Sequence, residues 1–348
     1  MILWAVLFIS GIFYGWLFTY CSILVARRYR VCDHPTPRSS HKIPTPRIGG
    51  IGIAAPLFLF YIFSYWNRKA SVHPSNLVLI DSILIGGGGC FLFGLLDDLR
   101  GMKPGKKFFF QFVFALFPVV FGYRIHSLAR FAGLVLPPFP GQVAALCWIL
   151  LMINAFNFMD GMNGMAAGFA ATAALFMSLL LKTGSLNLAL LAGVCIGFLI
   201  YNLTPAETFM GDCGSQLLGF VLAVIPLSLH SSNPVKYPFG SFVILLLPFL
   251  YDLLYTLVRR ITRGENIFQA HRTHLYQRLL VCGWSHPKVL RLAFITFLLC
   301  GLLSVGFAGT SQTGLRILYA LAALGIMVIY TGIVWRVEGK SSVHYDGI

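Results

Sequence analysis

Carboxylate side chains suited to a hard cation gather at three points of this sequence, and the first point is an adjacent pair. Asp97 and Asp98 end an apolar run. Two adjacent carboxylates repel each other unless a cation or a shared proton compensates them. At the C-terminal end of a helix they also oppose the helix dipole. A helix end that merely carries charge is the alternative, but this unfavourable placement favours a functional pair.

The second point is a polar stripe at the end of a later apolar run. Asn154, Asn157 and Asp160 follow one another at intervals of three, and Asn163 follows within a Gly-x-x-Gly segment. Intervals of three place side chains along one helical face. Polar groups in an apolar run are costly unless they coordinate or hydrogen-bond something. Hydrogen bonding between helices is the simpler explanation, but three such side chains on one stripe indicate a binding site.

The third point is the segment Phe209-Met-Gly-Asp212, which connects two apolar runs. Asp212 stands where a helix N-terminus would favour a phosphate, although ordinary capping of a turn uses the same residue types. Oxygen ligands suit Mg²⁺ or Mn²⁺. Together, the three points predict a site for such a cation.

Basic side chains occupy two of the connecting loops. In the loop 259–288, His271, Arg272 and His274 form a cluster that would suit a diphosphate. A topology signal or a lipid head-group patch explains this loop equally well. Lys42 and Arg47 belong to an earlier loop that prolines stiffen, and this loop would hold cations over the same face.

The composition indicates which class of protein carries these residues. Of the 348 residues, 57% are hydrophobic and 11% are charged, whereas a soluble domain has roughly 25% charged residues. The same composition excludes a disordered chain and indicates a polytopic membrane protein. Basic cytoplasmic loops or an anionic substrate explain the net charge of +15 better than nucleic acid does. The eight cysteines include no Cys-x-x-Cys pair, so neither a disulfide framework nor a zinc site is indicated.

Apolar runs long enough for a helix to cross a bilayer, roughly 17 to 25 residues, recur along the whole chain. We predict an all-α, polytopic membrane protein, with a single transmembrane domain over residues 1–348 and about eleven transmembrane helices. The runs are 2–26, 48–66, 76–96, 108–123, 143–159, 165–181, 186–203, 215–230, 239–258, 289–308 and 314–335.

Lys and Arg are distributed unevenly between the loops on the two sides. The loops after odd-numbered runs hold 18 basic residues and the other loops hold 6. By the positive-inside rule, the N-terminus is periplasmic and the C-terminus cytoplasmic. Nine of the eleven acidic residues lie on the same side, which predicts that the chemistry takes place on the cytoplasmic face. The cytoplasmic site loops are about 27–47, 97–107, 160–164, 204–214 and 259–288.

Five stretches, in this order, resemble the motifs of the polyprenyl-phosphate N-acetylhexosamine-1-phosphate transferases, glycosyltransferase family 4. They are Pro44–Gly50, Asp97-Asp98, Asn154–Gly164, Phe209–Gly214 and His271–Gln277. The resemblance implies transfer of an N-acetylhexosamine 1-phosphate from a UDP-sugar to undecaprenyl phosphate, with release of UMP. Such a reaction would begin lipid-linked O-antigen or other envelope polysaccharide synthesis at a bacterial inner membrane. Mg²⁺, or Mn²⁺ in its place, would be the cofactor.

The resemblance also implies roles for individual residues. Asp212 and Asn157 would hold the metal, and Asp97 and Asp98 would orient or deprotonate the lipid phosphate. The remaining positions would contact substrate: Asp160, Asn163 and Phe209 the nucleotide, and His271, Arg272 and His274 the diphosphate or sugar. From the basic loop and the polar stripe themselves, we add Lys42, Arg47 and Asn154 as candidate substrate contacts.

Two departures from the family pattern bear on the donor sugar. Asn163 stands where many members have Asp, and His271-Arg272-Thr-His274 replaces the run of adjacent histidines in the lipid I-forming branch. The second departure resembles the O-antigen and common-polysaccharide initiators. It leaves the donor open between N-acetylglucosamine and a 6-deoxy sugar such as N-acetylfucosamine or N-acetylquinovosamine.

Two other classes of protein compete with the transferase interpretation. A secondary transporter also has many spans and intramembrane acids such as Asp252, which needs a partner or a water-filled cleft. Transporter sites, however, lie near the midplane between repeats, whereas four of the five stretches lie at one interface and no repeat is evident. A non-catalytic scaffold would leave the clustered acids unexplained. Exposed apolar spans would permit a homodimer.

Overall fold

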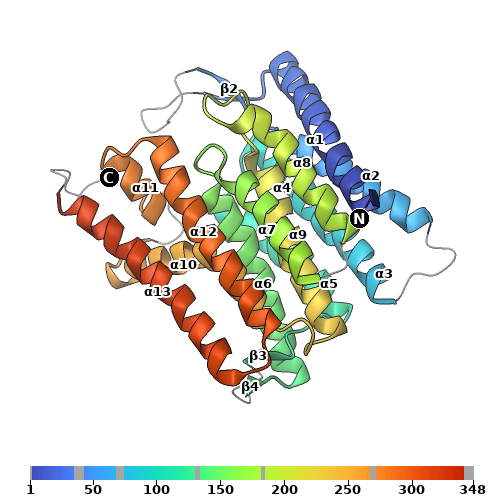
Figure 1. Cartoon of the computed structure of the whole chain (residues 1–348). Helices are drawn as coiled ribbons and strands as arrows, with labels where there is room; N and C mark the ends of the chain where they lie inside the picture. The colour runs from blue at the N-terminus through green and yellow to red at the C-terminus, as the bar shows by residue number, and fades with distance from the viewer. Residues whose placement is uncertain are drawn as a thin grey trace. The chain divides into compact units, whose positions relative to one another are not determined.

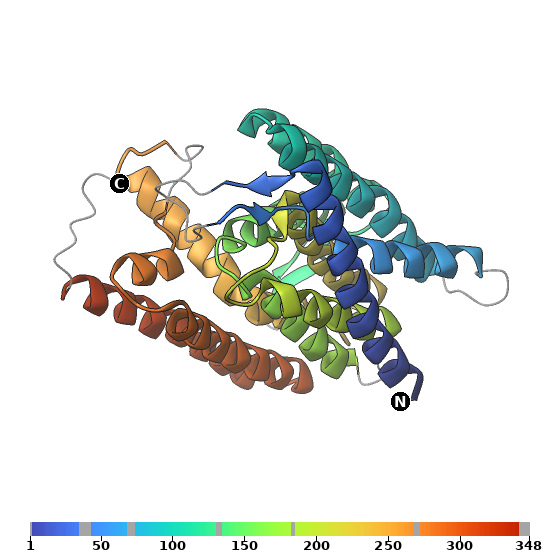
Figure 2. The same cartoon turned by 90° about the horizontal axis from the view of Figure 1, so that it is seen from above.

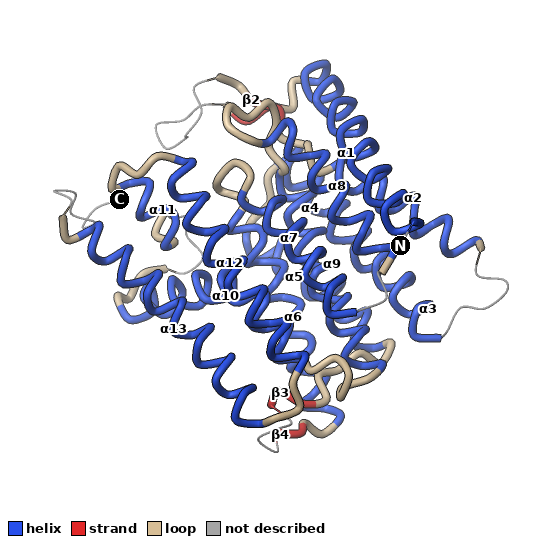
Figure 3. Tube along the Cα trace, in the orientation of Figure 1, coloured by secondary structure: helices blue, strands red, loops and turns tan. Residues whose placement is uncertain are grey.

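A computed structural model describes residues 2–34, 43–67, 74–129, 134–181, 185–266 and 272–340. It divides the chain into two compact units, Met1–Phe239 and Gly240–Ile348. Each unit is built of helices, as Figures 1 and 3 show. Helices are the expected result for such apolar runs, because a segment surrounded by lipid must satisfy its backbone hydrogen bonds internally.

The first unit contains most of the helices and two small antiparallel ribbons. Its helices are α1 (Ile2–Tyr29), α2 (Ile51–Trp66), α3 (Pro74–Asp81) continued by the π-helical segment η1 (Ser82–Gly87) and α4 (Gly88–Arg100), α5 (Pro104–Val120), α6 (Pro138–Met159), α7 (Met165–Leu181), α8 (Leu186–Asn202) and α9 (Gly211–Ser232). The ribbons pair β1 (Cys32–Asp33) with β2 (Thr45–Pro46), and β3 (Ser127–Ala129) with β4 (Leu134–Val135). Figure 2 shows β1 and β2 beyond the C-terminal end of α1.

Helix α9 forms the core of this unit, and it is buried along almost its whole length. Helices α4 and α6 pack closely against it. A Cβ on Gly94 of α4 would lie 2.6 Å from the Asp212 carbonyl oxygen, and one on Gly219 of α9 would lie 2.6 Å from the Met152 carbonyl oxygen of α6. Glycine therefore permits both close approaches, as is common between membrane helices. The approach at Gly94 brings the last turn of α4, with Asp97 and Asp98, to the first turn of α9.

The second unit consists of α10 (Phe239–Thr262), the short helix α11 (Leu275–Val281), and the neighbouring helices α12 (His286–Gly309) and α13 (Thr313–Glu338). Polar contacts join its helices: Ser304 Oγ donates to the Ser241 carbonyl oxygen at 2.8 Å, and the hydroxyls of Tyr251 and Thr331 lie 3.0 Å apart. The buried side chain of Arg278 in α11 forms an ion pair with Glu338 at the end of α13. The segment 259–288, which we expected to be a loop, therefore contains the helix α11, and the Arg278–Glu338 ion pair joins α11 to α13.

Each of the eleven apolar runs predicted from the sequence is helical, within a few residues at its ends. Over the described ranges, seven helices are long and apolar enough to cross a membrane, namely α1, Leu77–Arg100, α6, α9, α10, α12 and α13. Helices α2, α7 and α8 are apolar but shorter, and α5 covers the remaining run. The all-helical, polytopic class is confirmed. The count of eleven spans, the orientation of the termini and the single-domain organisation stay predictions.

Candidate active site

Two motifs that are far apart in the sequence run side by side at the cytoplasmic end predicted for the first unit. The Phe209 amide donates to the Pro46 carbonyl oxygen at 2.8 Å, and the Gly49 amide donates to the Phe209 carbonyl oxygen at 2.9 Å. A Cβ on Gly50 would lie 2.4 Å from the Gly214 nitrogen. Only glycine allows this contact, which explains the Gly-Gly that ends the first motif.

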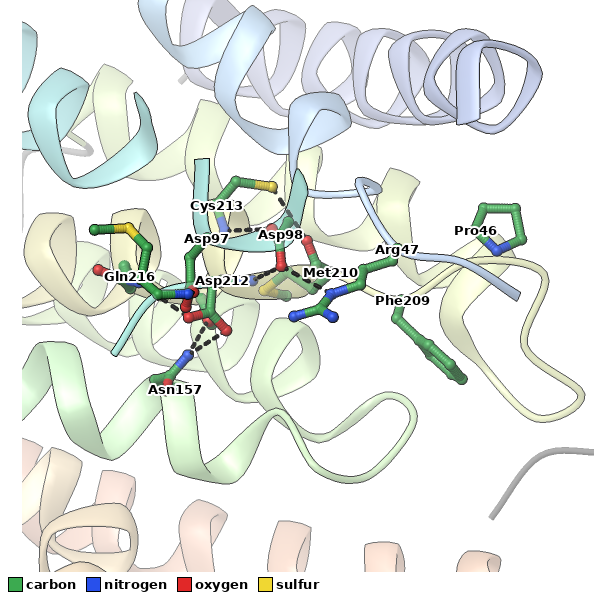
Figure 4. Close-up of polar contacts among 12 residues, drawn as sticks. Pro46, Arg47, Asp97, Asp98, Asn157, Phe209, Met210, Asp212, Cys213 and Gln216 are labelled. Carbon is green, nitrogen blue, oxygen red and sulfur yellow. Dashed lines mark hydrogen bonds and ion pairs between the residues drawn. The ribbon is translucent and has the colours of Figure 1, made fainter. Parts of the chain in front are cut away.

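Asp98 lies at the N-terminus of α9 and links three segments of the chain (Figure 4). Its Oδ1 accepts hydrogen bonds from the Asp212 amide at 3.0 Å and from Arg47 Nε at 3.1 Å, and its Oδ2 accepts from the Cys213 amide at 3.0 Å. The Asp98 side chain is 0% exposed. The first amides of a helix lack intrahelical partners, and a negative charge there is favourable. Asp98 therefore caps α9 with the protein's own carboxylate, at the place where the sequence suggested a substrate phosphate.

Arg47 and Gly211, which lie next to Asp98, suit its role as the cap of α9. Burial alone would lower the pKa of the Arg47 guanidinium, but the pairing with Asp98 outweighs burial and raises that pKa. Gly211 has a φ of +70°, which a residue with a side chain rarely adopts. A Cβ there would lie 2.5 Å from Asp98 Oδ2. The Gly-Asp order of the motif is thus required by the cap.

A lysine lies at the centre of the acidic cluster. Lys107, in the first turn of α5, forms ion pairs with Asp212 and, at 3.2 Å, with Asp97, and its Nζ donates to Asn157 Oδ1 at 3.3 Å. Asp97, Asn157 and Asp212 come from α4, α6 and α9, and Figure 4 shows these three side chains turned toward one another. The structure thus brings together the two predicted metal ligands, Asn157 and Asp212, with Asp97 beside them.

A chain of amide side chains extends from this cluster into the helix bundle. Asn157 Nδ2 donates to Asp212 Oδ1 at 3.0 Å, and Gln216 Nε2 donates to Asp212 Oδ2 at 3.2 Å. Deeper in the bundle, Gln111 Nε2 donates to Gln216 Oε1 at 3.3 Å, and Asn154 Nδ2 donates to Gln111 Oε1 at 3.1 Å. Asn154 therefore holds the network one turn before Asn157, and its side chain forms a helix–helix hydrogen bond between α6 and α5.

The last two residues of the predicted polar stripe, Asp160 and Asn163, come directly after the end of α6. Burial, with the negative charges of Asp212 and Asp98, raises the pKa of the Asp160 carboxyl well above its usual range, although a hydrogen bond from the Gly211 backbone opposes the rise. Asn163 donates through Nδ2 to Thr204 Oγ1 at 3.4 Å, in the segment after α8. Asp160 therefore lies within the influence of the acidic cluster, whereas the hydrogen bond of Asn163 joins it to the end of α8.

Phe209 is half-buried, and in Figure 4 its ring points away from the carboxylates. Its backbone joins the two motifs, as described above, so the position of the ring follows from the same contacts that fix Asp212. The predicted residues Lys42 and His271 lie outside the described residues.

In the second unit, the predicted diphosphate contact His274 is a buried residue. Its side chain is 3% exposed, and its Nδ1 lies 3.1 Å from Asp252 Oδ1. The same oxygen accepts the Leu275 amide at 2.9 Å and the Thr256 hydroxyl at 3.1 Å. Asp252 therefore has the partners that a charged residue in an apolar run requires. His274 fixes the start of α11, whereas Arg272, two residues earlier, is exposed.

Sequence reasoning missed Lys107, Gln111 and Gln216. Lys107 was counted only as one of the basic residues of the loop 97–107. A spacing signal was present, since Gln111 follows Lys107 by four residues and Gln216 follows Asp212 by four. Side chains four residues apart are neighbours on a helix, so each glutamine extends a charged residue of the cluster into the bundle.

The donor set of the cluster suits a hard cation. Among the residues that the structure describes, no group of three or more His, Cys, Asp or Glu side chains is arranged to hold a metal ion. The cluster instead offers two carboxylates and one amide oxygen, from Asp97, Asp212 and Asn157. Oxygen ligands of this kind suit Mg²⁺, and the ammonium group between them shows that the position attracts positive charge.

Comparisons with known proteins identify relatives that match most of this chain. The sequence model of glycosyl transferase family 4 matches residues 80–230, which include the last turn of α4, the polar stripe and most of α9. The decaprenyl-phosphate N-acetylglucosaminephosphotransferase of Mycobacterium leprae is 30% identical over 88% of this chain and 84% of its own length. The probable undecaprenyl-phosphate N-acetylglucosaminyl 1-phosphate transferase of Bacillus subtilis is 27% identical, over 90% and 86%. An undecaprenyl-phosphate alpha-N-acetylglucosaminyl 1-phosphate transferase of Escherichia coli is 27% identical, over 86% and 82%.

Proposed function

Because the chain belongs to glycosyl transferase family 4, we propose that it transfers N-acetylglucosamine 1-phosphate from UDP-N-acetylglucosamine to a polyprenyl phosphate such as undecaprenyl phosphate. An oxygen of the lipid phosphate attacks the β-phosphorus of the donor. The bond from that phosphorus to the bridging oxygen breaks, and UMP leaves. The observation that carries the proposal is the convergence of Asp97, Asn157 and Asp212 from three helices. Their oxygens surround one position, which the ammonium group of Lys107 occupies.

Asp212 and Asn157, with Asp97 beside them, would hold Mg²⁺ or Mn²⁺. When bound, the metal offsets the negative charge that the two phosphate-bearing substrates bring together. Asn157 is oriented by its hydrogen bond to Asp212, and Asp212 by Gln216. The amide network behind the cluster would therefore keep the ligand oxygens in place while substrates exchange.

The geometry of Asp98 supports a positioning role rather than a basic one. Both of its oxygens already accept hydrogen bonds, and its side chain has no exposed surface. A base is also unnecessary, because a phosphate monoester with a second pKa of about 6 is mostly dianionic at pH 7. In this proposal Asp97, whose Oδ1 also accepts the Met102 amide, orients the lipid phosphate, and Asp98 holds the segment that carries Asp212.

Other residues would bind the substrates. Asp160, Asn163 and Phe209 would contact the nucleotide, with Lys42 and Arg47 supplying positive charge near it. Arg272 and His271 would bind the diphosphate or sugar, and we assign to His274 the support of their loop, because that side chain is buried against Asp252. The reaction would take place at the cytoplasmic face of a bacterial inner membrane, where the nucleotide sugar is dissolved.

Transfer of radioactive sugar to lipid tests this function. Membranes or detergent-solubilised protein would be incubated with UDP-[¹⁴C]N-acetylglucosamine, Mg²⁺ and undecaprenyl phosphate, with decaprenyl phosphate in a parallel reaction. Radioactivity in the organic phase, absent with Asp212→Asn, is the expected result. Label that stays in the aqueous phase with both lipids, but enters with a UDP-6-deoxy-N-acetyl sugar, would correct the donor. Accumulation of the labelled compound inside sealed vesicles, without lipid product, would favour a transporter.

A further inference from the structure

The ammonium group of Lys107 occupies the position among the ligands proposed for the metal. It contacts Asp97 Oδ2 at 3.2 Å, Asn157 Oδ1 at 3.3 Å, and Asp212 Oδ2 in a closer ion pair. A carboxylate and an amide oxygen are groups that a divalent cation would use. Two cations cannot share these oxygens at close range, because like charges repel strongly where little water screens them.

We propose that Lys107 is a built-in counterion of the metal site. It neutralises Asp212 and Asp97 while the metal is absent, and it withdraws from Asp212 and Asn157 when a divalent cation enters. This inference rests on the metal site of the proposed function and adds a residue that competes with the metal.

The surroundings of Lys107 make such an exchange feasible. The side chain is 21% exposed and belongs to the first turn of α5, so the ammonium can reach water. A lysine carries its charge on a flexible four-carbon stem, and such side chains readily turn their charged end toward solvent while the stem stays packed. The Arg47–Asp98 pair nearby differs, because the buried amides of α9 also hold Asp98.

The need for a counterion follows from the charges of the cluster. Asp97 and Asp212 share Lys107 as a partner, and the Asp212 side chain is only 16% exposed. Carboxylates this close raise each other's free energy unless a cation compensates them, and leaving a buried charge unpaired is strongly destabilising. Lys107 therefore keeps the metal-free site folded, and each metal ion that binds must displace part of this ion pair. The lysine should weaken metal binding and stabilise the metal-free protein.

Direct metal binding tests the proposal without measuring transfer. Free Mn²⁺ would be counted by electron paramagnetic resonance during titration of the full-length, detergent-solubilised protein. Lys107→Met, which keeps the length of the stem and removes the charge, should bind Mn²⁺ at least about tenfold more tightly than the unmodified chain, or about 1.4 kcal/mol. The matched control is Lys106→Met, at an exposed neighbouring position, and its dissociation constant should stay within twofold. An unchanged or weaker affinity for Lys107→Met would overturn the proposal.

A second measurement uses the unmodified chain and so does not depend on the variant folding. Acetylation of individual lysines by a succinimidyl ester would be followed by mass spectrometry, with and without Mn²⁺. Release from Asp212 and Asn157 should raise the acetylation rate of Lys107 severalfold, while the rate at Lys106 stays constant. A rate at Lys107 that is unchanged or reduced by Mn²⁺ contradicts the exchange.

The two sets of results separate this proposal from the proposed function. A chain that transfers sugar phosphate, but whose Lys107→Met variant binds Mn²⁺ no better, rejects the counterion alone. A chain that shows the exchange but transfers nothing to lipid rejects the proposed reaction and leaves the counterion standing. A chain that binds no Mn²⁺, with or without the substitution, rejects the counterion whatever the activity.

Discussion

Replacing Asp98 by asparagine distinguishes a carboxylate that positions the site from one that acts as a base. The substitution keeps the size of the side chain but replaces one acceptor oxygen with an amide group. If the new amide group takes the place of Oδ2, it faces the Cys213 amide. If it takes the place of Oδ1, it faces the Asp212 amide and Arg47 Nε. All three of these groups are donors. Two donors facing each other in a buried position lose their hydrogen bond and also repel.

The expected cost can be worked out from these contacts. A hydrogen bond to a charged group contributes about 1.5 to 3 kcal/mol, and breaking a buried ion pair by removing one partner costs roughly 3 to 5 kcal/mol. The Asp98 side chain has no exposed surface, but that of Arg47 is 38% exposed, so the lower end of the second range applies. We expect Asp98→Asn to reduce the free energy of unfolding by about 3 kcal/mol.

The assay is thermal unfolding of the detergent-solubilised protein, measured as the loss of the folded-protein peak in size-exclusion chromatography. Transfer activity is measured at a temperature where the variant is folded. The melting temperature should fall by at least about 5 °C, and part of the activity should remain. A double-mutant cycle with Arg47→Met should give a coupling energy of roughly 0.5 to 3 kcal/mol. A variant with an unchanged melting temperature and no transfer would refute the positioning role, because it would show that Asp98 takes part in the chemistry.

Further substitutions and metal removal test other parts of the site. Excess EDTA should abolish transfer and added Mg²⁺ restore it, whereas full activity in EDTA would reject the metal. Asp212→Asn should abolish turnover in a protein that still inserts and folds, and near-normal transfer would remove Asp212 from the site. Arg272→Ala should lower kcat/KM for the nucleotide sugar about 10- to 150-fold, the equivalent of one charge-assisted hydrogen bond, with little change in KM for the lipid. A selective effect on the lipid would assign this loop to the other substrate. Gly211→Ala should destabilise the fold, because its Cβ would lie 2.5 Å from Asp98 Oδ2, and a melting temperature equal to that of the unmodified chain would contradict the described cap.

The helical framework could be predicted from the sequence because it depends on long apolar runs, which are a local property. The sequence predicted that the motifs lie on the same face of the membrane, but not which of their side chains meet. It depends on where helices meet, and hence on residues such as Gly94 and Gly219, whose lack of a side chain allows α4 and α6 to approach α9. No pattern in the sequence marks which neighbouring helix such a glycine will contact.

The individual roles were harder to predict than the site. Asp97 and Asp98 are adjacent and chemically identical, yet one lies at the cation position and the other is buried under the first turn of α9. Successive residues of a helix point in directions about 100° apart, so adjacency in sequence gives little information about shared surroundings. His274 gave a similar difficulty. A histidine in a basic loop suggests an anion contact, and only the structure shows its pairing with Asp252, 22 residues earlier.

The fate of the β-phosphate tests the proposed reaction most directly. The full-length chain would be given UDP-N-acetylglucosamine labelled with ³²P in the β-phosphate and with ³H in the sugar, together with a polyprenyl phosphate. Transfer of sugar phosphate predicts that both labels enter the lipid in equal molar amounts and that the nucleotide released is unlabelled UMP. Lipid that carries ³H without ³²P, with labelled UDP in the aqueous phase, would show that the bond broken lies between the sugar and the phosphate, and it would contradict the reaction proposed for this site.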